Sequence, residues 1–178
     1  MFTKADIEKY FRAEKQESLL FVLIGVAGII TAVVFFFFLK TNFYKGAAIP
    51  LLLVGLLLGV AGYTVYKRSD GDRKRNVYAY DMNPAELKEK ELPRMKTVIK
   101  NFVIYRYVEI VLALTGIGLF TYFFKTDGRF AGSYTPFWKG FGFTLAVMAL
   151  LALAADFFAE KRGKVYIKGI ESFIEGKA

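Results

Sequence analysis

Four long apolar runs constrain this chain more than any other feature, because each is close to the length of a membrane-spanning helix. They extend from Ser18 to Leu39, Gly46 to Tyr66, Phe102 to Phe124 and Phe141 to Phe158. A helix rises about 1.5 Å per residue, so roughly twenty residues cross the hydrocarbon core of a bilayer. The sequence therefore predicts an all-α integral membrane protein with four transmembrane helices, arranged as two antiparallel hairpins.

The segments between and around these runs are too short for a second large domain, so residues 1–178 are expected to form one membrane domain. We expect an amphipathic helix at 1–17, a loop at 67–100 holding a short helix at 84–91, an outer loop at 125–140 and a tail at 161–178. The tail is predicted to form a second amphipathic helix. Both amphipathic helices are expected to lie on the cytoplasmic membrane surface. Their apolar sides are Ile7, Tyr10, Phe11 and Ala13 in the first and Tyr166, Ile170, Phe173 and Ile174 in the second.

Local signals divide the 67–100 loop. The run Ser69-Asp70-Gly71-Asp72 is typical of a turn, Asn83-Pro84 is typical of a helix start, and Pro93 is expected to end the short helix.

The basic residues lie beside the apolar runs and predict the orientation of the chain. Nineteen of the 25 Lys and Arg residues fall in the N-terminal segment, the 67–100 loop and the tail, and five fall in the two other connections. The positive-inside rule therefore places both termini and the 67–100 loop in the cytoplasm. No cleavable leader is apparent, and a bacterial inner membrane fits this pattern. Nucleic-acid binding is not expected, because the charge is not gathered on a separate folded domain.

The chain has no cysteine and no histidine, which restricts its chemistry. Most zinc sites, haem ligation, Ser-His and Cys-His catalysis and histidine pH switching are thereby excluded. The acids Asp70, Asp72 and Asp81 lack the repeated spacing of a divalent-metal loop. We therefore expect no metal, no cofactor and no enzymatic activity.

Small residues at helical spacing predict the faces on which the spans pack, because they let backbones approach closely in lipid. These residues are Gly25, Gly28, Gly55, Gly59, Gly62, Gly116, Gly142 and Ala146. Packing within one chain and a homodimer seam are both compatible with this pattern.

Four charged residues are predicted to converge at the cytoplasmic ends of the spans, on the sides that face other helices. They are Glu17, Arg106, Glu109 and Asp156. One interpretation is a structural lock in which Arg106 bridges Glu109 and Asp156; the other is a site for a cation, a proton or a basic group of a partner.

Two further groups of residues each have a structural and a functional interpretation. Lys67, Arg68, Arg73, Lys74 and Arg75 either fix the topology or contact anionic lipid. The aromatic residues of the outer loop either form an interfacial belt or, with the segment from Tyr78 to Pro93, contact a partner. The aromatic residues concerned are Phe130, Tyr134, Phe137 and Trp138.

These observations favour a nonenzymatic membrane protein that binds another membrane protein, or a second copy of itself, as an accessory, regulatory or immunity-like subunit. The alternative is a small oligomeric ion channel or transporter that uses the acidic cluster. Ionisable side chains are absent from the middle of every apolar run, which argues against a carboxylate relay.

Overall fold

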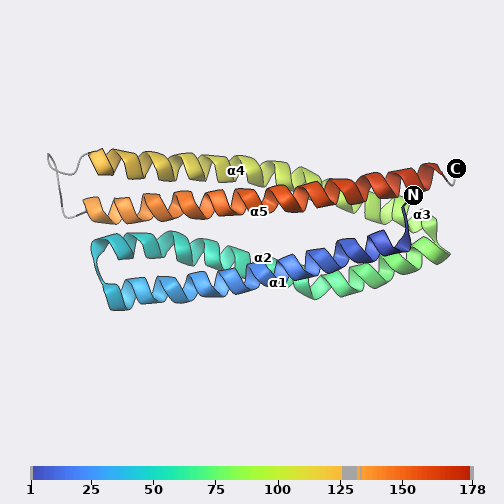
Figure 1. Ribbon diagram of the computed structural model, residues 1–178, viewed down its shortest axis with the longest axis horizontal. Coiled ribbons are helices and arrows are strands. Elements are labelled where there is room, and N and C mark those ends of the chain that lie inside the picture. The colour runs from blue at the N-terminus through green and yellow to red at the C-terminus, as the bar shows by residue number, and fades with distance from the viewer. Residues whose placement is uncertain (1, 126–131, 133, 177–178) are drawn as a thin grey trace. The chain divides into compact units, whose positions relative to one another are not determined.

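The computed structural model describes residues 2–125, 132 and 134–176, and these residues form an all-helical fold (Figure 1). Helix α1 is extended by a π-helical segment, η1, and a second such segment, η2, joins the short α3 to α4. The elements in order are α1 (Lys4–Val34), η1 (Phe35–Leu39), α2 (Asn42–Met82), α3 (Pro84–Glu86), η2 (Leu87–Glu91), α4 (Leu92–Lys125) and α5 (Thr135–Glu175).

Four helices among the described residues are long and apolar enough to span a membrane, as predicted. They correspond to α1 with η1, to α2, to α3 through α4, and to α5. Helix α2 has 41 residues and is therefore about 60 Å long, twice the thickness of a hydrocarbon core. Each of these helices continues well past its apolar run, which is compatible with an integral membrane protein that has a helical extension outside the bilayer.

The chain forms two compact units. One, which we call the charged unit, comprises Met1–Leu20, Gly62–Tyr105 and Ala155–Ala178, and the other, the apolar unit, comprises Phe21–Ala61 and Arg106–Ala154. Helices α1, α2, α4 and α5 each contribute to both units without a break.

In the apolar unit, α1 and α2 pack backbone against backbone. A methyl group on Gly25 would lie 2.6 Å from the carbonyl oxygen of Gly55 and 2.8 Å from the nitrogen of Gly59. Helices α4 and α5 meet in the same way, because a methyl group on Gly116 would lie 2.5 Å from the nitrogen of Ala146. Only glycine fits such close approaches, and the gain is van der Waals packing.

A third contact joins these two pairs. Gly46 of α2 lies directly against the backbone of Phe137, and Gly140 of α5 lies directly against the backbone of Phe43. Within the apolar unit the helices consequently form a row in the order α4, α5, α2, α1, as seen at the left of Figure 1.

The charged unit has its own apolar core. Its buried members come from the segment before the first helix and from α1, α2, η2, α4 and α5. They are Phe2, Ile7, Tyr10, Phe11, Ala79, Leu87, Met95, Tyr166 and Ile170. The amphipathic segments at the two ends of the chain were predicted to lie on the membrane surface, and this prediction is wrong. Their apolar sides face each other and η2 instead, because helices extended from all four spans offer a protein surface to bury against.

The predicted loop at 67–100 and its turn at Ser69–Asp72 are also wrong. Helix α2 continues through this segment to Met82, and only residue 83 separates it from α3. Ser69 is buried, Asp70 is paired with Lys15 of α1, and Asp72 is 3.0 Å from Arg75, so tertiary contacts and local pairs override the turn composition.

The remaining boundaries differ in detail from those expected. The range 84–91 is helical, but the prediction that Pro93 ends this helix is wrong. The π-helical η2 runs directly into α4, and Pro93 lies within the continuous helix from Pro84 to Lys125. Helix α5 begins at Thr135 rather than at 141, so part of the predicted outer loop is helical. Between η1 and α2 the chain turns at Lys40, whose φ is 55°.

Candidate functional site

The most elaborate polar arrangement among the described residues lies in the charged unit and is centred on Glu91. This carboxylate is only 2% exposed. The Arg94 guanidinium donates two charge-assisted hydrogen bonds to it, 2.8 Å from Nε to Oε2 and 2.6 Å from Nη2 to Oε1. Arg75 of α2 adds a contact at 3.8 Å. A buried carboxylate needs such partners, since taking it out of water alone costs several kcal/mol, on the order of the whole stability of a small domain.

The arrangement continues to α1 through Glu14. The hydroxyl of buried Ser69 donates to Glu14 Oε2 at 3.0 Å, and Arg68 approaches the same carboxylate at 4.0 Å. Burial raises the pKa of Glu14, and the hydrogen bond from Ser69 and the charges of Arg68 and Arg94 oppose that rise. The net shift is upward, so the folded state disfavours the charged form of Glu14 relative to water.

Two stacked tyrosines adjoin these charges. The rings of Tyr10 and Tyr166 lie 4.1 Å apart at an interplanar angle of 6°, and the Tyr10 hydroxyl donates to the sulfur of Met95 at 3.6 Å. Arg162 lies over the Tyr10 ring at 5.7 Å. Burial raises the pKa of both tyrosines, and the nearby Glu91 carboxylate raises that of Tyr166 further. Both hydroxyls consequently stay protonated at physiological pH.

The charges of this arrangement balance. We call it the Glu91 network, and it comprises Glu14, Arg68, Asp72, Arg75, Glu91 and Arg94. Three acids face three arginines, so the formal charges of these six residues cancel. The network joins α1, α2, η2 and α4 and thereby holds the charged unit in one arrangement.

Sequence reasoning missed the Glu91 network. Glu91 and Arg94 are three residues apart in a segment rich in Lys and Glu, which resembles an exposed helix with surface ion pairs. The sequence offers one hint, the apolar residues Leu87 and Met95, each four residues from Glu91, which place its face of the helix toward a core.

The four residues predicted to converge are distributed over both units. Glu17 and Asp156 belong to the charged unit, and Arg106 and Glu109 belong to the apolar unit. The structure pairs Glu17 with Arg162 of α5, a partner that the sequence did not indicate. Asp156, Arg106 and Glu109 are all half-buried. Convergence of the four stays a prediction.

The basic stretch divides into two classes. Arg68, Arg73 and Arg75 are each engaged with an acid, at 4.0 Å from Glu14, 3.6 Å from Asp70 and 3.0 Å from Asp72, respectively. Lys67 and Lys74 are exposed and make no ion pair with the described residues.

Most of the predicted packing residues lie at helix contacts of the apolar unit. Besides the contacts given above, a methyl group on Gly142 would lie 2.7 Å from the nitrogen of Phe120, and one on Gly28 would lie 3.5 Å from the carbonyl oxygen of Leu51. Gly62 belongs to the charged unit and is buried. A homodimer seam stays a prediction.

The aromatic residues near the start of α5 differ in their exposure. Tyr134 is 75% exposed, whereas Trp138 stacks on Phe123 of α4, with ring centroids 6.2 Å apart. Phe137 packs through its backbone against α2. Phe130 lies outside the described residues.

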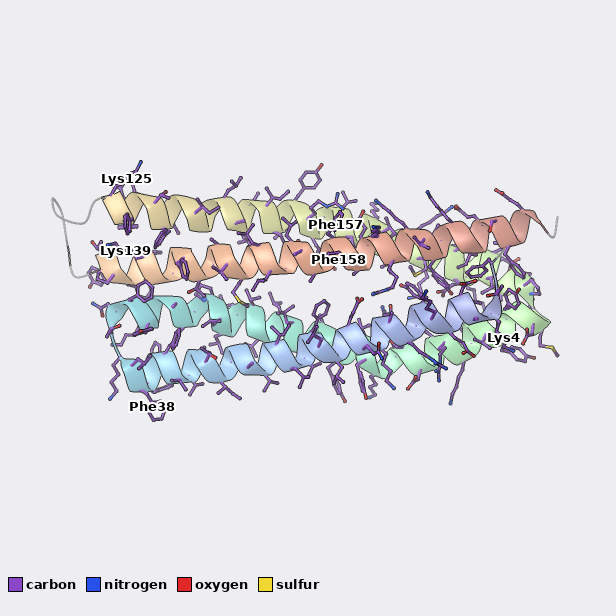
Figure 2. All side chains as sticks on the ribbon, in the orientation of Figure 1. Lys4, Phe38, Lys125, Lys139, Phe157 and Phe158 are labelled. Carbon is purple, nitrogen blue, oxygen red and sulfur yellow. The ribbon has the colours of Figure 1, made fainter. Side chains whose placement is uncertain are left out.

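Figure 2 shows Phe38, Lys125 and Lys139 at the same end of the apolar unit, where aromatic and lysine side chains gather. The Lys139 ammonium lies 5.5 Å from the centre of the Phe124 ring. Such pairs are typical of a membrane interface, where the ring sits at the headgroup level and the ammonium reaches water.

Among the described residues, no three Asp, Glu, His or Cys side chains gather in a way that could hold a metal ion. Comparisons of the chain with protein-family models, with curated proteins and with solved structures found no match.

Proposed function

We propose that this chain is a nonenzymatic, protein-binding or regulatory subunit of a membrane assembly. Its four helices would cross the bilayer as two antiparallel hairpins, with both termini and the charged unit on the cytoplasmic side of a bacterial inner membrane. The observation that carries the proposal is that all four apolar helices continue into a unit with its own buried core and a charge-balanced network. Such a unit is too well ordered to be a set of connecting loops, and Glu91, its most buried charged residue, is paired with Arg94 of the same unit.

The dimensions of the apolar unit support this placement. The segment of α1 and η1 from Phe21 to Phe38 rises about 27 Å, close to the thickness of a hydrocarbon core. Lysine and aromatic side chains gather at one end of the apolar unit (Figure 2). The excess of Lys and Arg in the segments of the charged unit favours the cytoplasmic side for that unit.

A binding subunit should be isolated with a second protein at a fixed molar ratio. The chain would be tagged, extracted from its native membrane in mild detergent and analysed by quantitative mass spectrometry and native mass. Recovery of one protein at a constant ratio across detergents supports the proposal, whereas recovery of a bare monomer that retains its folded far-UV and near-UV spectra contradicts it.

The competing function is ion transport through the acidic residues. It predicts that the purified protein alone moves protons or cations across liposomes, and that Glu109→Gln and Asp156→Asn abolish this flux. We expect no flux from wild type above that of empty liposomes. If Asp156 belongs to a structural lock, Asp156→Asn lowers the thermal stability in detergent instead.

A further inference from the structure

One face of α2 in the charged unit is exposed from end to end. It comprises Lys67, Gly71, Lys74, Tyr78 and Met82, and we call it the α2 face. The spacing of four, three, four and four residues places these side chains in one line along the helix. All five are exposed, and Tyr78 and Met82 reach 61% and 69% exposure. Two large apolar side chains therefore stand in solvent on a helix whose opposite side is buried in the core.

The charge on the α2 face is positive. Lys67 and Lys74 make no ion pair with the described residues, although the Lys74 charge contributes to lowering the pKa of Asp70. The two acids that border the face, Asp70 and Asp81, are paired with lysines of α1, Lys15 and Lys4. The face therefore presents two exposed ammonium groups together with two exposed apolar side chains.

The glycine in the α2 face borders open space. A methyl group on Gly71 would meet nothing within 4 Å. A glycine in a helix interior costs about 1 kcal/mol relative to alanine, and no contact within the described residues offsets this. Its absent side chain leaves room for the backbone of another helix to approach closely.

The length of the α2 face distinguishes a protein ligand from a lipid ligand. Tyr78 and Met82 lie about 16 and 22 Å further along the helix than Lys67. Lys67 directly follows the predicted second span, so anionic headgroups are within its reach, but electrostatic attraction to a membrane fades within about 8–10 Å. An anionic membrane surface is within reach of Lys67 alone, so a ligand that also covers exposed Tyr78 and Met82 extends away from the membrane.

We propose that the α2 face binds an acidic amphipathic helix of a partner protein, which lies along α2. Aliphatic side chains of this helix would pack on Tyr78 and Met82, its carboxylates would meet Lys67 and Lys74, and its backbone would approach α2 at Gly71. The proposal rests on the protein-binding function proposed above and names the surface and the chemistry of the partner.

The test is photo-crosslinking in native membranes, with p-benzoylphenylalanine in place of Tyr78 in the full chain. We expect an adduct whose crosslinked peptide, sequenced by mass spectrometry, belongs to another protein and is acidic and helical in pattern. Adding Lys74→Glu should lower the yield of this adduct about tenfold or more, because like charges would then face each other. The matched control is Lys9→Glu, an equal charge reversal at an exposed lysine of α1, which should leave the yield unchanged.

Three outcomes overturn the inference. They are an adduct with a second copy of this chain, an adduct with phospholipid, and an adduct with a protein that Lys74→Glu does not weaken. A second probe at Tyr134 separates this inference from the proposed function. Capture of a protein at Tyr134 and none at Tyr78, by chains with wild-type thermal transitions, overturns the α2 face and leaves the binding function standing; capture at neither position contradicts both.

Discussion

The close contact between α4 and α5 makes a sharp prediction about two glycines of one helix. Gly116→Ala should destabilise the apolar unit, and Gly118→Ala, two residues further on, should not. A methyl group on Gly116 would lie 2.5 Å from the nitrogen and 2.9 Å from the Cα of Ala146, and 2.7 Å from the carbonyl oxygen of Gly142. All three atoms belong to the backbone of α5, so the methyl group is accommodated only if one helix moves away from the other. A methyl group on Gly118 would meet nothing within 4 Å.

The magnitudes follow from these contacts. Overpacking a close contact costs about 1–3 kcal/mol, and Gly116→Ala belongs in the upper part of that range because no flexible side chain can yield. Replacing an exposed helical glycine by alanine gains at most about 1 kcal/mol. The two variants should therefore differ by roughly 2–4 kcal/mol in the free energy of unfolding.

Trp138 provides the assay, because it is the single tryptophan of the chain and stacks on Phe123 across the contact between α4 and α5. Its fluorescence is followed as the protein unfolds in mixed micelles of increasing SDS content. We expect the transition of Gly116→Ala at lower SDS than wild type, and that of Gly118→Ala at or above wild type. Equal shifts for the two variants would refute the packing argument.

Three further predictions concern the charged unit and its orientation. Glu91→Gln removes the nearest counter-ion of half-buried Arg94, which keeps only Asp72 at 4.0 Å, and should lower the stability of the charged unit by up to about 3 kcal/mol, measured by thermal unfolding followed by circular dichroism. The raised pKa of Glu14 means that its stabilising contribution is complete below the ordinary value of 4.5 and is lost as the pH rises through the folded-state pKa. Glu14→Gln should therefore raise the melting temperature at pH 8 and lose this advantage near pH 4; an equal shift at both pH values would contradict the assignment. Because the chain has no cysteine, Lys9→Cys and Lys125→Cys test the orientation: in intact cells an impermeant maleimide should label only position 125.

The four long helices were predictable because length and hydropathy alone determine which segments can cross a bilayer. Their extensions were not. The run from Ser69 to Asp72 has the composition of a turn, and it is helical because Lys15, more than fifty residues earlier, pairs with Asp70, and Glu14 accepts a hydrogen bond from Ser69. Contacts between residues so far apart in the chain cannot be read from the local composition, so the helical extension could not be predicted from it.

The apolar periodicity of the end segments was predicted correctly, but the surface against which their apolar sides pack was not. Ile7, Tyr10 and Phe11 do form one apolar side, and that side would serve equally well against lipid or against protein. The choice depends on Leu87 and Met95, which reach the same core only because η2 and α4 return beside α1. For the same reason Glu91 could not be distinguished from an exposed glutamate.

Residues of one helix belong to both units, which makes their coupling a question for experiment. Helix α2 carries Gly55 against α1 in the apolar unit and the α2 face in the charged unit. If the units unfold as one cooperative structure, Glu91→Gln shifts the Trp138 transition as well as the loss of helix; if each unfolds alone, the Trp138 transition stays at its wild-type position. The first result would let a partner bound to the charged unit stabilise the membrane helices by mass action, because binding to the folded state alone raises its stability. The second would confine the effect of the partner to the charged unit, and regulation through the membrane would then require a partner that also contacts the spans.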